Sequence, residues 1–401
     1  MKRELVYMDS KSSKFWNLEL KANTYTVTYG RIGTAGQTLT KSFTGDAEAL
    51  KDAEKLIKEK LGKGYVDAGG SGASASGSSD QPGDLIPLLA FSSILRREDI
   101  SSNMGTFIGR RVVDYDPEKD FRSELVPRFR GDYDENPTIA NLKHFLASDL
   151  ARECRGLVVG AWHGDDTEGN SEEVIQELVQ GSPSLPNLSA LYIGDITSEE
   201  CEISWIHQSD LSPLLKAFPK LQLLRARGGD GLRLSQPSHT QLRGLALETG
   251  GMDVEVIRSV CQSDFPNLEY LELWLGTDEY GANHSIADLQ PILSGRLFPK
   301  LKYLGLRNSQ QADELAGVLV NSPILNRLET LDLSLGVLTN DGAKSLLQLP
   351  PSPTLKKLNL HYNFIDAALI RQLKALPLTV DASKPADMDD DEEWRFVAVG
   401  E

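Results

Sequence analysis

One short polar segment of this sequence has the residue types of a metal site. Residues 163–166 read His-Gly-Asp-Asp, and Glu168 follows. Histidine and carboxylates can bind a hard cation, but neither their spacing nor their number matches a known cage. We therefore interpret the segment as a solvated loop. The three cysteines lack CxxC or zinc-site spacing and are expected to be core residues: Cys154, Cys201 and Cys261.

A second segment has the groups of nucleophilic catalysis. His207, Ser209 and Asp210 could supply a base, a nucleophile and an acid. Side chains this close in sequence rarely face one another, so a loop packed by Trp205 is the better interpretation. Residues 228–231 read Gly-Gly-Asp-Gly, which lacks the Lys-Ser/Thr of a phosphate-binding loop and predicts a turn. We therefore expect no enzyme, no cofactor and no metal.

The composition is that of a globular protein. Hydrophobic residues make up 40% of the 401 residues, and charged residues make up 25%. No apolar run reaches the roughly 18 residues of a membrane-spanning helix. The first ten residues, MKRELVYMDS, lack the apolar centre of a signal peptide. We expect a cytoplasmic protein of more than one domain, without a membrane partner.

Charge is unevenly distributed along the chain. The net charge is −16, yet residues 1–66 carry 12 basic against 8 acidic residues, a net charge of +4. Of the 42 basic and 58 acidic residues in the whole chain, 30 and 50 remain for the rest, a net charge of −20. The asymmetry suggests different partners for the two parts, although a need for solubility alone could produce it.

A Gly/Ser-rich segment is the clearest domain boundary. Residues 69–79 read GGSGASASGSS and contain no apolar side chain larger than alanine, so they have almost nothing to bury. We predict a first domain over residues 1–66 and a flexible linker over residues 67–83.

The first domain has the pattern of a small antiparallel sheet crossed by one helix. Residues 5–7, 14–20 and 24–29 are rich in aromatic and β-branched side chains, which predicts strands. Residues 46–61 place apolar side chains on one helical stripe.

A leucine frame recurs after the linker. Eight copies of Leu-x-x-Leu-x-Leu, five strict and three looser, follow one another in order. Such a series is typical of a leucine-rich-repeat array, in which each copy is a strand followed by a returning segment. The strict frames begin at Leu242, Leu268, Leu301, Leu328 and Leu355, and the looser ones begin at Cys154, Leu188 and Leu221.

The returning segments have the pattern of helices. Residues 172–179, 313–320 and 341–347 each begin with Asp or Glu, which suits a helix N-terminus. The predicted fold class is therefore α/β: the small sheet and helix are joined by the linker to an irregular leucine-rich-repeat solenoid with parallel inner strands and outer helices. The repeats are expected over residues 151–382.

Both flanks of the repeats lack the leucine frame. Residues 84–150 are expected to cap the first edge, with a strand at 110–115 and a helix at 138–150. Residues 383–401 are expected to be an acidic tail, whose last residues form a short strand or fold back on the body.

Several motifs of the first domain occur together in one known family. They are Lys-Phe-Trp at residues 14–16, Tyr-Gly-Arg-Ile-Gly at 29–33, Gly-Gln at 36–37, Lys-Ser-Phe at 41–43 and the helix end at 59–65. With them, residues 14–65 resemble the WGR domain of poly(ADP-ribose) polymerases and several bacterial proteins. The sequence departs from that family at Tyr29, where the name-giving tryptophan stands.

The resemblance implies a role for the Gly-Arg turn. In the polymerases the domain contacts DNA ends, with the aromatic ring against a terminal sugar and the arginine nearby, and those roles fall to Tyr29 and Arg31. Glycine permits a tight turn that presents the arginine, and arginine binds phosphate as a planar fork. The predicted nucleic-acid contacts are Tyr29, Gly30, Arg31 and Lys41. Alternatively, the glycines only shape the turn and Arg31 braces it.

Segments of the larger part also resemble one family. Residues 193–210, 225–231, 273–280 and 395–399 look like those of bacterial cytoplasmic leucine-rich-repeat proteins, some of which carry a WGR domain in front. Molybdate-metabolism-regulator-like proteins share this pairing more loosely. The resemblance implies the fold and architecture, and it names no biochemical role.

Alternation along the repeat strands predicts a binding face. The fourth and sixth frame positions point into the core, so the third, fifth and seventh face the concave side. The predicted protein-binding residues there are Tyr192, Arg225, Arg227, Tyr270, Glu272, Trp274, Tyr303 and Arg307. Aromatic and arginine side chains are favoured at interface hot spots. Alternatively, irregular loops fold over this face and bury the aromatic rings.

Together these patterns favour a non-catalytic cytoplasmic scaffold that binds a protein through the concave face. The alternative is a nucleic-acid-binding protein that uses the WGR-like module on DNA ends or breaks. The small positive charge of that module predicts weak, salt-sensitive binding.

Overall fold

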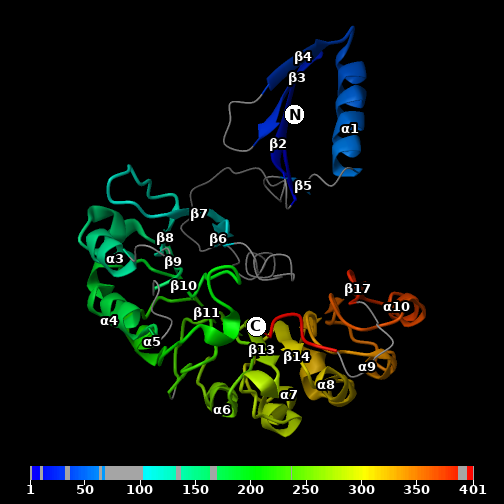
Figure 1. The fold of residues 1–401 in the computed structure, drawn as a ribbon. Coiled ribbons are helices and arrows are strands. Elements are labelled where there is room, and N and C mark those ends of the chain that lie inside the picture. The colour runs from blue at the N-terminus through cyan, green and yellow to red at the C-terminus, as the bar shows by residue number, and fades with distance from the viewer. Residues whose placement is uncertain are drawn as a thin grey trace. The chain divides into compact units, whose positions relative to one another are not determined.

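The computed structural model describes residues 2–9, 12–31, 37–62, 66–67, 103–131, 137–162, 169–235, 237–386 and 395–400. The chain divides into two compact units, a small unit of residues 1–81 and a large unit of residues 82–401 (Figure 1). This boundary falls within the range predicted as a linker. Residues 163–168, interpreted above as a solvated loop, and residues 387–394 of the expected acidic tail lie outside the described residues.

The small unit is an antiparallel sheet with one helix, as the sequence predicts. The strand order is β4-β3-β2-β1-β5, and α1 spans Asp46–Gly62. The strands are β1 Lys2–Asp9, β2 Ser12–Lys21, β3 Thr24–Arg31, β4 Gln37–Ser42 and β5 Val66–Asp67.

Alternate residues of β2 and β3 form the core of the small unit. Leu18 and Val27 are paired across the two strands and buried, and they share one cluster with Ala49 and Ala53 of α1. The opposite face carries threonines whose hydroxyls meet across β3 and β4. One face of the sheet is therefore covered by the helix, and the other is polar.

The large unit is built on one long sheet. Its strand order runs from β17 back to β6 without a break, and every pair from β7 to β17 is parallel. All eight leucine frames give a strand: β9 Gly156–Val159, β10 Ala190–Ile193, β11 Leu223–Arg227, β12 Gly244–Glu248, β13 Tyr270–Gly276, β14 Tyr303–Ser309, β15 Thr330–Asp332 and β16 Lys357–Asn359. The edge strand β17 spans Thr379–Asp381.

The register of these strands aligns the leucines at the fourth position of successive frames. Eight leucines stand opposite one another along the sheet: Leu157, Leu191, Leu224, Leu245, Leu271, Leu304, Leu331 and Leu358. All eight are fully buried. Because a shift by one residue would turn each leucine to the other face, the leucine frame itself fixes the register.

Short helices line the outer side of the curved row of strands (Figure 1). The predicted helices are confirmed within a residue or two at α4, α8 and α9, and shorter ones complete the row. They are α4 Glu172–Gln180, α5 Ser212–Ala217, α6 Val254–Cys261, α7 Gln290–Leu293, α8 Ala312–Leu319, α9 Asn340–Leu346 and α10 Ala367–Leu373.

The region before the repeats extends the same sheet. Strands β6 Thr106–Phe107, β7 Arg110–Asp114 and β8 Val126–Phe129 continue it beyond β9, and α3 Thr138–Leu146 packs nearby. The predicted strand and helix are thus confirmed, although the helix ends earlier and a 3-10 turn, Asp149–Glu153, follows it. Strand β8 was not expected from the sequence, because a four-residue strand containing Pro127 gives almost no local signal.

The C-terminal segment folds back on the large unit. Residues 395–400 carry no strand, so the second of the two expectations for this segment holds. Val399 is buried with Trp274, Leu335 and Ile203, and the backbone N–H of Ala398 donates to the carbonyl of Leu335 at 2.8 Å. The segment lies across the inner side of the sheet, drawn in red in Figure 1.

One asparagine binds the C-terminal segment through both the nitrogen and the oxygen of its side-chain amide. Asn308 Nδ2 donates to the carbonyl of Val399 at 2.5 Å, and Asn308 Oδ1 accepts from the N–H of Val399 at 3.0 Å. Asn308 has a φ of 54°, which glycine adopts without strain. Asn308→Gly should therefore lower the free energy of unfolding by about 1–3 kcal/mol and remove the hydrogen-exchange protection of the Val399 amide.

A matched variant separates this effect from the general cost of adding glycine. Lys384 is exposed and also has a positive φ, 50°. Lys384→Gly should leave the Val399 amide protected. Equal protection of that amide in Asn308→Gly would contradict the anchoring role.

Candidate functional site

The exposed aromatic ring of the small unit belongs to Tyr29. It stands on β3 opposite Trp16 of β2 and Gln37 of β4, and its hydroxyl donates to Gln37 Oε1 at 3.2 Å. Directly opposed residues share a face of the sheet, and Trp16 is buried in the cluster that includes α1. Tyr29 nevertheless remains 40% exposed, so its ring is available for stacking.

Lys41 lies on the same face of the small sheet as Tyr29 but not next to it. It pairs with Tyr25, four residues before Tyr29 on β3, a distance of about 13 Å along the strand. Its Nζ binds Asp52 Oδ2 at 2.9 Å and lies 4.6 Å from the centre of the Phe43 ring. The predicted set of nucleic-acid contacts is therefore not one compact cluster, because Lys41 is engaged with α1.

Asp52 also organises the buried end of this face. Tyr25 donates its hydroxyl to Asp52 Oδ2 at 2.8 Å. Burial, together with the neighbouring carboxylate, raises the pKa of Tyr25 to about 12. The hydrogen bond from Lys41 lowers the pKa of Asp52, which keeps the carboxylate ionised between its two partners.

The Gly-Arg pair ends strand β3. Gly30 is half-buried opposite Phe15, and the backbone of Arg31 stands opposite Lys14. The side chain of Arg31 and the turn at residues 32–36 lie outside the described residues. The structure therefore places Tyr29 and Gly30 side by side, while the two predicted roles of Arg31 stay open.

The predicted binding face of the large unit is buried. The alternation holds for the aromatic side chains: Tyr192, Tyr270 and Tyr303 share one cluster and Trp274 lies in another, both separate from the cluster of the frame leucines. The expected exposure is wrong, and the alternative of a covered face is what the structure has. All eight predicted partner-binding residues are at most 4% exposed: Tyr192, Arg225, Arg227, Tyr270, Glu272, Trp274, Tyr303 and Arg307.

Segments distant in sequence cover this face. Met104, Phe107 and Ile108, from the region before the repeats, pack with the cluster around Tyr192. The C-terminal residue Val399 packs with Trp274. None of these covering residues belongs to the leucine frame, which is why alternation along the strands could not reveal the cover.

Charges on the buried face are paired. Glu248 binds both Arg225 and Arg227, the latter at 2.8 Å from Oε2 to Nε. Glu272 Oε1 accepts from Arg307 NH1 at 2.8 Å and from Trp274 Nε1 at 2.7 Å. Buried charges persist when each has a partner, so this network has the chemistry of a core.

The aromatic rings complete the same network. Tyr270 and Tyr303 stack at 4.0 Å between ring centres, and Tyr303 donates its hydroxyl to Asp332 Oδ2 at 2.8 Å. The guanidinium of Arg307 lies 5.2 Å from the centre of the Trp274 ring. The guanidinium of Arg225 lies 5.0 Å from the centre of the Tyr192 ring. These contacts join the aromatic and charged side chains to one another, while the Tyr192 hydroxyl and Arg225 Nε are buried without a hydrogen-bond partner among the described residues.

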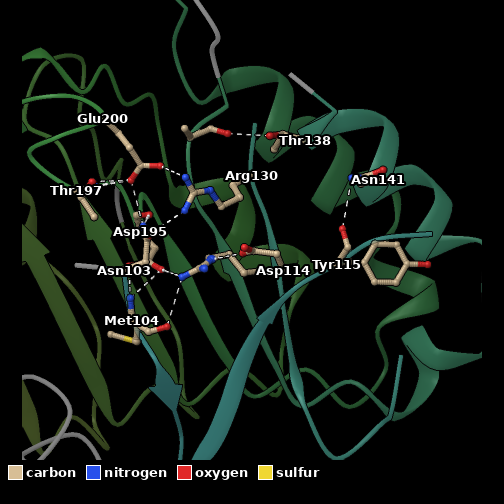
Figure 2. A network of polar contacts seen from close by, with 12 residues as sticks. Asn103, Met104, Asp114, Tyr115, Arg130, Thr138, Asn141, Asp195, Thr197 and Glu200 are labelled. Atoms are coloured by element: carbon tan, nitrogen blue, oxygen red, sulfur yellow. Dashed lines mark hydrogen bonds and ion pairs between the residues drawn. The ribbon is translucent and has the colours of Figure 1, made fainter. Parts of the chain in front are cut away.

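A second polar network fastens the start of the large unit (Figure 2). Asp195 accepts from the N–H of Met104 at 3.0 Å and from Arg128 NH1 at 2.9 Å. Asn103 donates to the carbonyl of Asp195 and to Glu200, and Glu200 also binds Arg130. Because these charges pair with one another, we interpret the network as a brace between residues 103–104 and the strand ends.

The other candidate catalytic groups are not brought together as a triad. His207 Nδ1 contacts Asp230, Ser209 Oγ lies 3.1 Å from Ser171 Oγ, and Asp210 accepts from Ser212. Burial raises the pKa of the Cys154 thiol to about 12 and that of Cys261 to about 11, which disfavours their thiolates. Among the described residues, no group of three His, Cys, Asp or Glu is placed to hold a metal.

Trp205 differs from its expected role. We expected it to pack its loop, but the side chain is 60% exposed at the end of the 3-10 turn Ile203–Trp205. It faces a cavity whose other walls come from later repeats. The local sequence contains no signal for this, because the walls belong to three other loops.

Comparison with known proteins identifies the first domain. Residues 1–72 match the model of the WGR domain, which confirms that resemblance. Over 65 residues the chain is 42% identical to the uncharacterized protein YfeS and 45% identical to protein YehF, both of Escherichia coli strain K12. These matches cover 16% of this chain and 27% and 24% of those proteins, so the chain spans about a quarter of each relative.

A solved structure resembles the chain over nearly its whole length. It is the crystal structure of a protein from Bacteroides fragilis, with a TM-score of 0.68 and 29% sequence identity over 97% of this chain and 98% of that one. The leucine-rich-repeat family stays a prediction. In the described part of the chain, no helix has the length and apolar character needed to cross a membrane.

Proposed function

We propose that the protein binds nucleic acid through its WGR domain, with the Tyr29 ring as a stacking contact and Arg31 as a phosphate contact. The observation that carries the proposal is an exposed aromatic side chain at the end of β3, within a domain of a kind that often binds nucleic acid. A base or sugar can stack on such a ring without regard to sequence.

Charge supports the same assignment. Residues 1–66 carry a net +4 and the remaining residues a net −20, so phosphates are attracted to the first domain and repelled by the rest. Few phosphates can be neutralised at +4, so we expect weak binding that is lost as the salt concentration increases. The WGR resemblance favours DNA ends or breaks as the ligand.

Two substitutions test the proposal. Tyr29→Ala should weaken binding of nicked or blunt-ended DNA by about 1–3 kcal/mol, the usual value of one stacking contact. Arg31→Ala should reduce binding and lower the magnitude of the salt slope by about one. Fluorescence anisotropy with nicked, blunt and single-stranded DNA at two salt concentrations measures both effects.

The control is an exposed ring outside the first domain. Phe396 is 51% exposed in the C-terminal segment, and Phe396→Ala should leave DNA binding unchanged. The melting temperature of Arg31→Ala decides between the two roles of that residue. A large drop in melting temperature would make Arg31 a brace, and unchanged binding in Tyr29→Ala would overturn the stacking contact.

We also propose that the large unit is a leucine-rich-repeat array that acts as a non-catalytic cytoplasmic scaffold for a protein partner. The serial strand–helix units and the strongly acidic composition support this role. Its contact surface lies away from the buried inner face. Cross-linking of the full chain in cells tests it: a specific partner should still cross-link to Tyr29→Ala and Arg31→Ala variants, and loss of the partner in both would assign it to the WGR domain.

A further inference from the structure

The carboxyl ends of four neighbouring strands enclose a cavity. Loops that follow β10, β11, β12 and β13 line a volume of about 410 Å³, all within the large unit. Carboxyl ends of parallel strands meet at one edge of a sheet, so residues far apart in sequence converge there. The lining includes the side chains of Trp205, Asp230, Arg233, Asp253 and Glu279.

The floor of the cavity is backbone. A Cβ atom on Gly250 would lie 2.2 Å from Ser204 Oγ and 2.5 Å from the carbonyl oxygen of Gly400, and one on Gly251 would lie 2.2 Å from the carbonyl oxygen of Tyr280. Contacts this short exclude a side chain at either position. The two glycines therefore keep the floor closely packed, and the C-terminal segment closes its base.

One wall of the cavity is the Trp205 side chain. The side chain is 60% exposed, so its ring is accessible to a ligand. Single exposed apolar side chains are common at protein surfaces, but this one lines a cavity. Tryptophan is also the aromatic side chain that attracts a cation most strongly over its face.

The polar lining has an excess of carboxylates. The lining contains three carboxylates and one arginine, namely Asp230, Asp253, Glu279 and Arg233. The arginine NH1 donates to the carbonyl of Leu232 at 2.7 Å. Asp230 contacts His207, and one oxygen of Asp253 accepts from the N–H of Glu255 at 2.7 Å. Each ionised carboxylate has about four acceptor positions, so these contacts leave acceptors for a ligand.

We propose that this cavity binds an arginine side chain of a basic peptide segment. A guanidinium can stack on the Trp205 face while its N–H groups donate to carboxylates as a planar fork. The charge of −20 over residues 67–401 would attract a basic segment and hold an acidic one away. The inference deepens the scaffold role proposed above, because it names the chemistry of the partner.

Other ligand classes fit the lining less well. An anion would meet three carboxylates and a single arginine. A neutral sugar could stack on tryptophan, but it would not use the excess negative charge. The volume of about 410 Å³ can hold an arginine side chain with part of the peptide beside it, and the rest of the peptide would contribute by its overall charge.

The test is a titration of the full chain with four capped probes. They are a Gly/Ser nonapeptide with three central arginines, the same peptide with lysines, the same with uncharged citrullines, and chitotriose. Binding is measured by isothermal calorimetry and by the ¹⁵N-indole NMR signal of Trp205, assigned with Trp205→Phe. We expect the arginine peptide to bind most tightly, the citrulline peptide to bind at least about tenfold more weakly, and the Trp205 signal to shift.

Two variants distinguish the ring from its apolar area. Trp205→Leu keeps an apolar side chain but loses the aromatic face, and it should weaken the arginine peptide by about tenfold. Trp205→Phe should weaken it less. Glu279→Gln should also weaken binding, whereas Asp341→Asn, which removes an equally exposed carboxylate far from the cavity on α9, should not. Because Trp205 is largely exposed, these variants should keep the wild-type melting temperature.

Three outcomes would overturn the proposal. Equal binding of the citrulline and arginine peptides would exclude recognition of charge, and a Trp205 shift caused by chitotriose alone would assign the cavity to a sugar. Binding of the arginine peptide that is unaffected by Trp205→Leu would place basic segments elsewhere on the unit. That last result would remove the cavity assignment and leave the scaffold role standing, whereas failure of the cellular cross-linking would remove the scaffold role itself.

Discussion

Replacement of Glu248 by glutamine is expected to lower the free energy of unfolding of the large unit by about 3–5 kcal/mol. Glu248 is fully buried and is the shared partner of Arg225 and Arg227. Glutamine keeps the shape and one acceptor oxygen, but it leaves two buried guanidinium groups without a counter-charge. Loss of one partner of a buried ion pair costs far more than the net value of the pair, because the other charge stays desolvated.

The same carboxylate predicts how stability depends on pH. Burial alone would raise the pKa of Glu248, but the charges of Arg225 and Arg227 outweigh burial and hold it below the usual value. A depressed pKa in the folded state stabilises the protein above the unfolded-state pKa, and this contribution is lost as the pH falls through the folded value. The stability difference between the wild type and Glu248→Gln should therefore shrink as the solution is acidified below about pH 4.

Urea unfolding at several pH values measures both effects. The matched control is Glu329→Gln, since Glu329 pairs with Lys356 at the surface and exposed pairs are worth at most about 1 kcal/mol. A Glu248→Gln variant as stable as Glu329→Gln would show that the buried network is not held together by its charges.

Trp274→Ala is expected to destabilise the large unit by about 3–5 kcal/mol, the usual cost of emptying a large aromatic site in a core. The ring is fully buried against Val399 and Leu335, and its Nε1 donates to Glu272 at 2.7 Å. The substitution therefore leaves a cavity and removes one of the hydrogen bonds to a buried carboxylate. This reverses the expectation from the sequence, by which Trp274 lies on an exposed protein-binding face.

Two further variants make the prediction sharp. Trp205→Ala removes the same residue type from an exposed position and should change the stability by less than about 0.5 kcal/mol. Trp274→Phe should cost less than Trp274→Ala, because the phenyl ring refills part of the cavity. Both variants lose the N–H donor to Glu272. Equal melting temperatures for Trp274→Ala and Trp205→Ala would contradict the buried position of Trp274.

The burial of these groups also decides how the two units differ as binding surfaces. In the small unit the aromatic ring of Tyr29 stays exposed near the end of β3. In the large unit the aromatic rings of the inner face are buried, and the exposed Trp205 lies in a loop after β10 instead.

The sequence by itself determined the local structure and the register of this protein. Strands at all eight leucine frames and the helix of the first domain follow from patterns within a few residues. A period of two or 3.6 needs no distant partner to be recognised. The WGR motifs also lie within one short domain, so their resemblance was visible without the fold.

Only the tertiary structure decided which faces are covered. Alternation places Trp274 opposite the leucine core, but it cannot show that Val399, 125 residues later, packs on that ring. It likewise cannot show that four loops after β10 to β13 meet around Trp205. Burial depends on which segments come together in space, and segments without a repeat pattern carry no periodic signal of where they will lie.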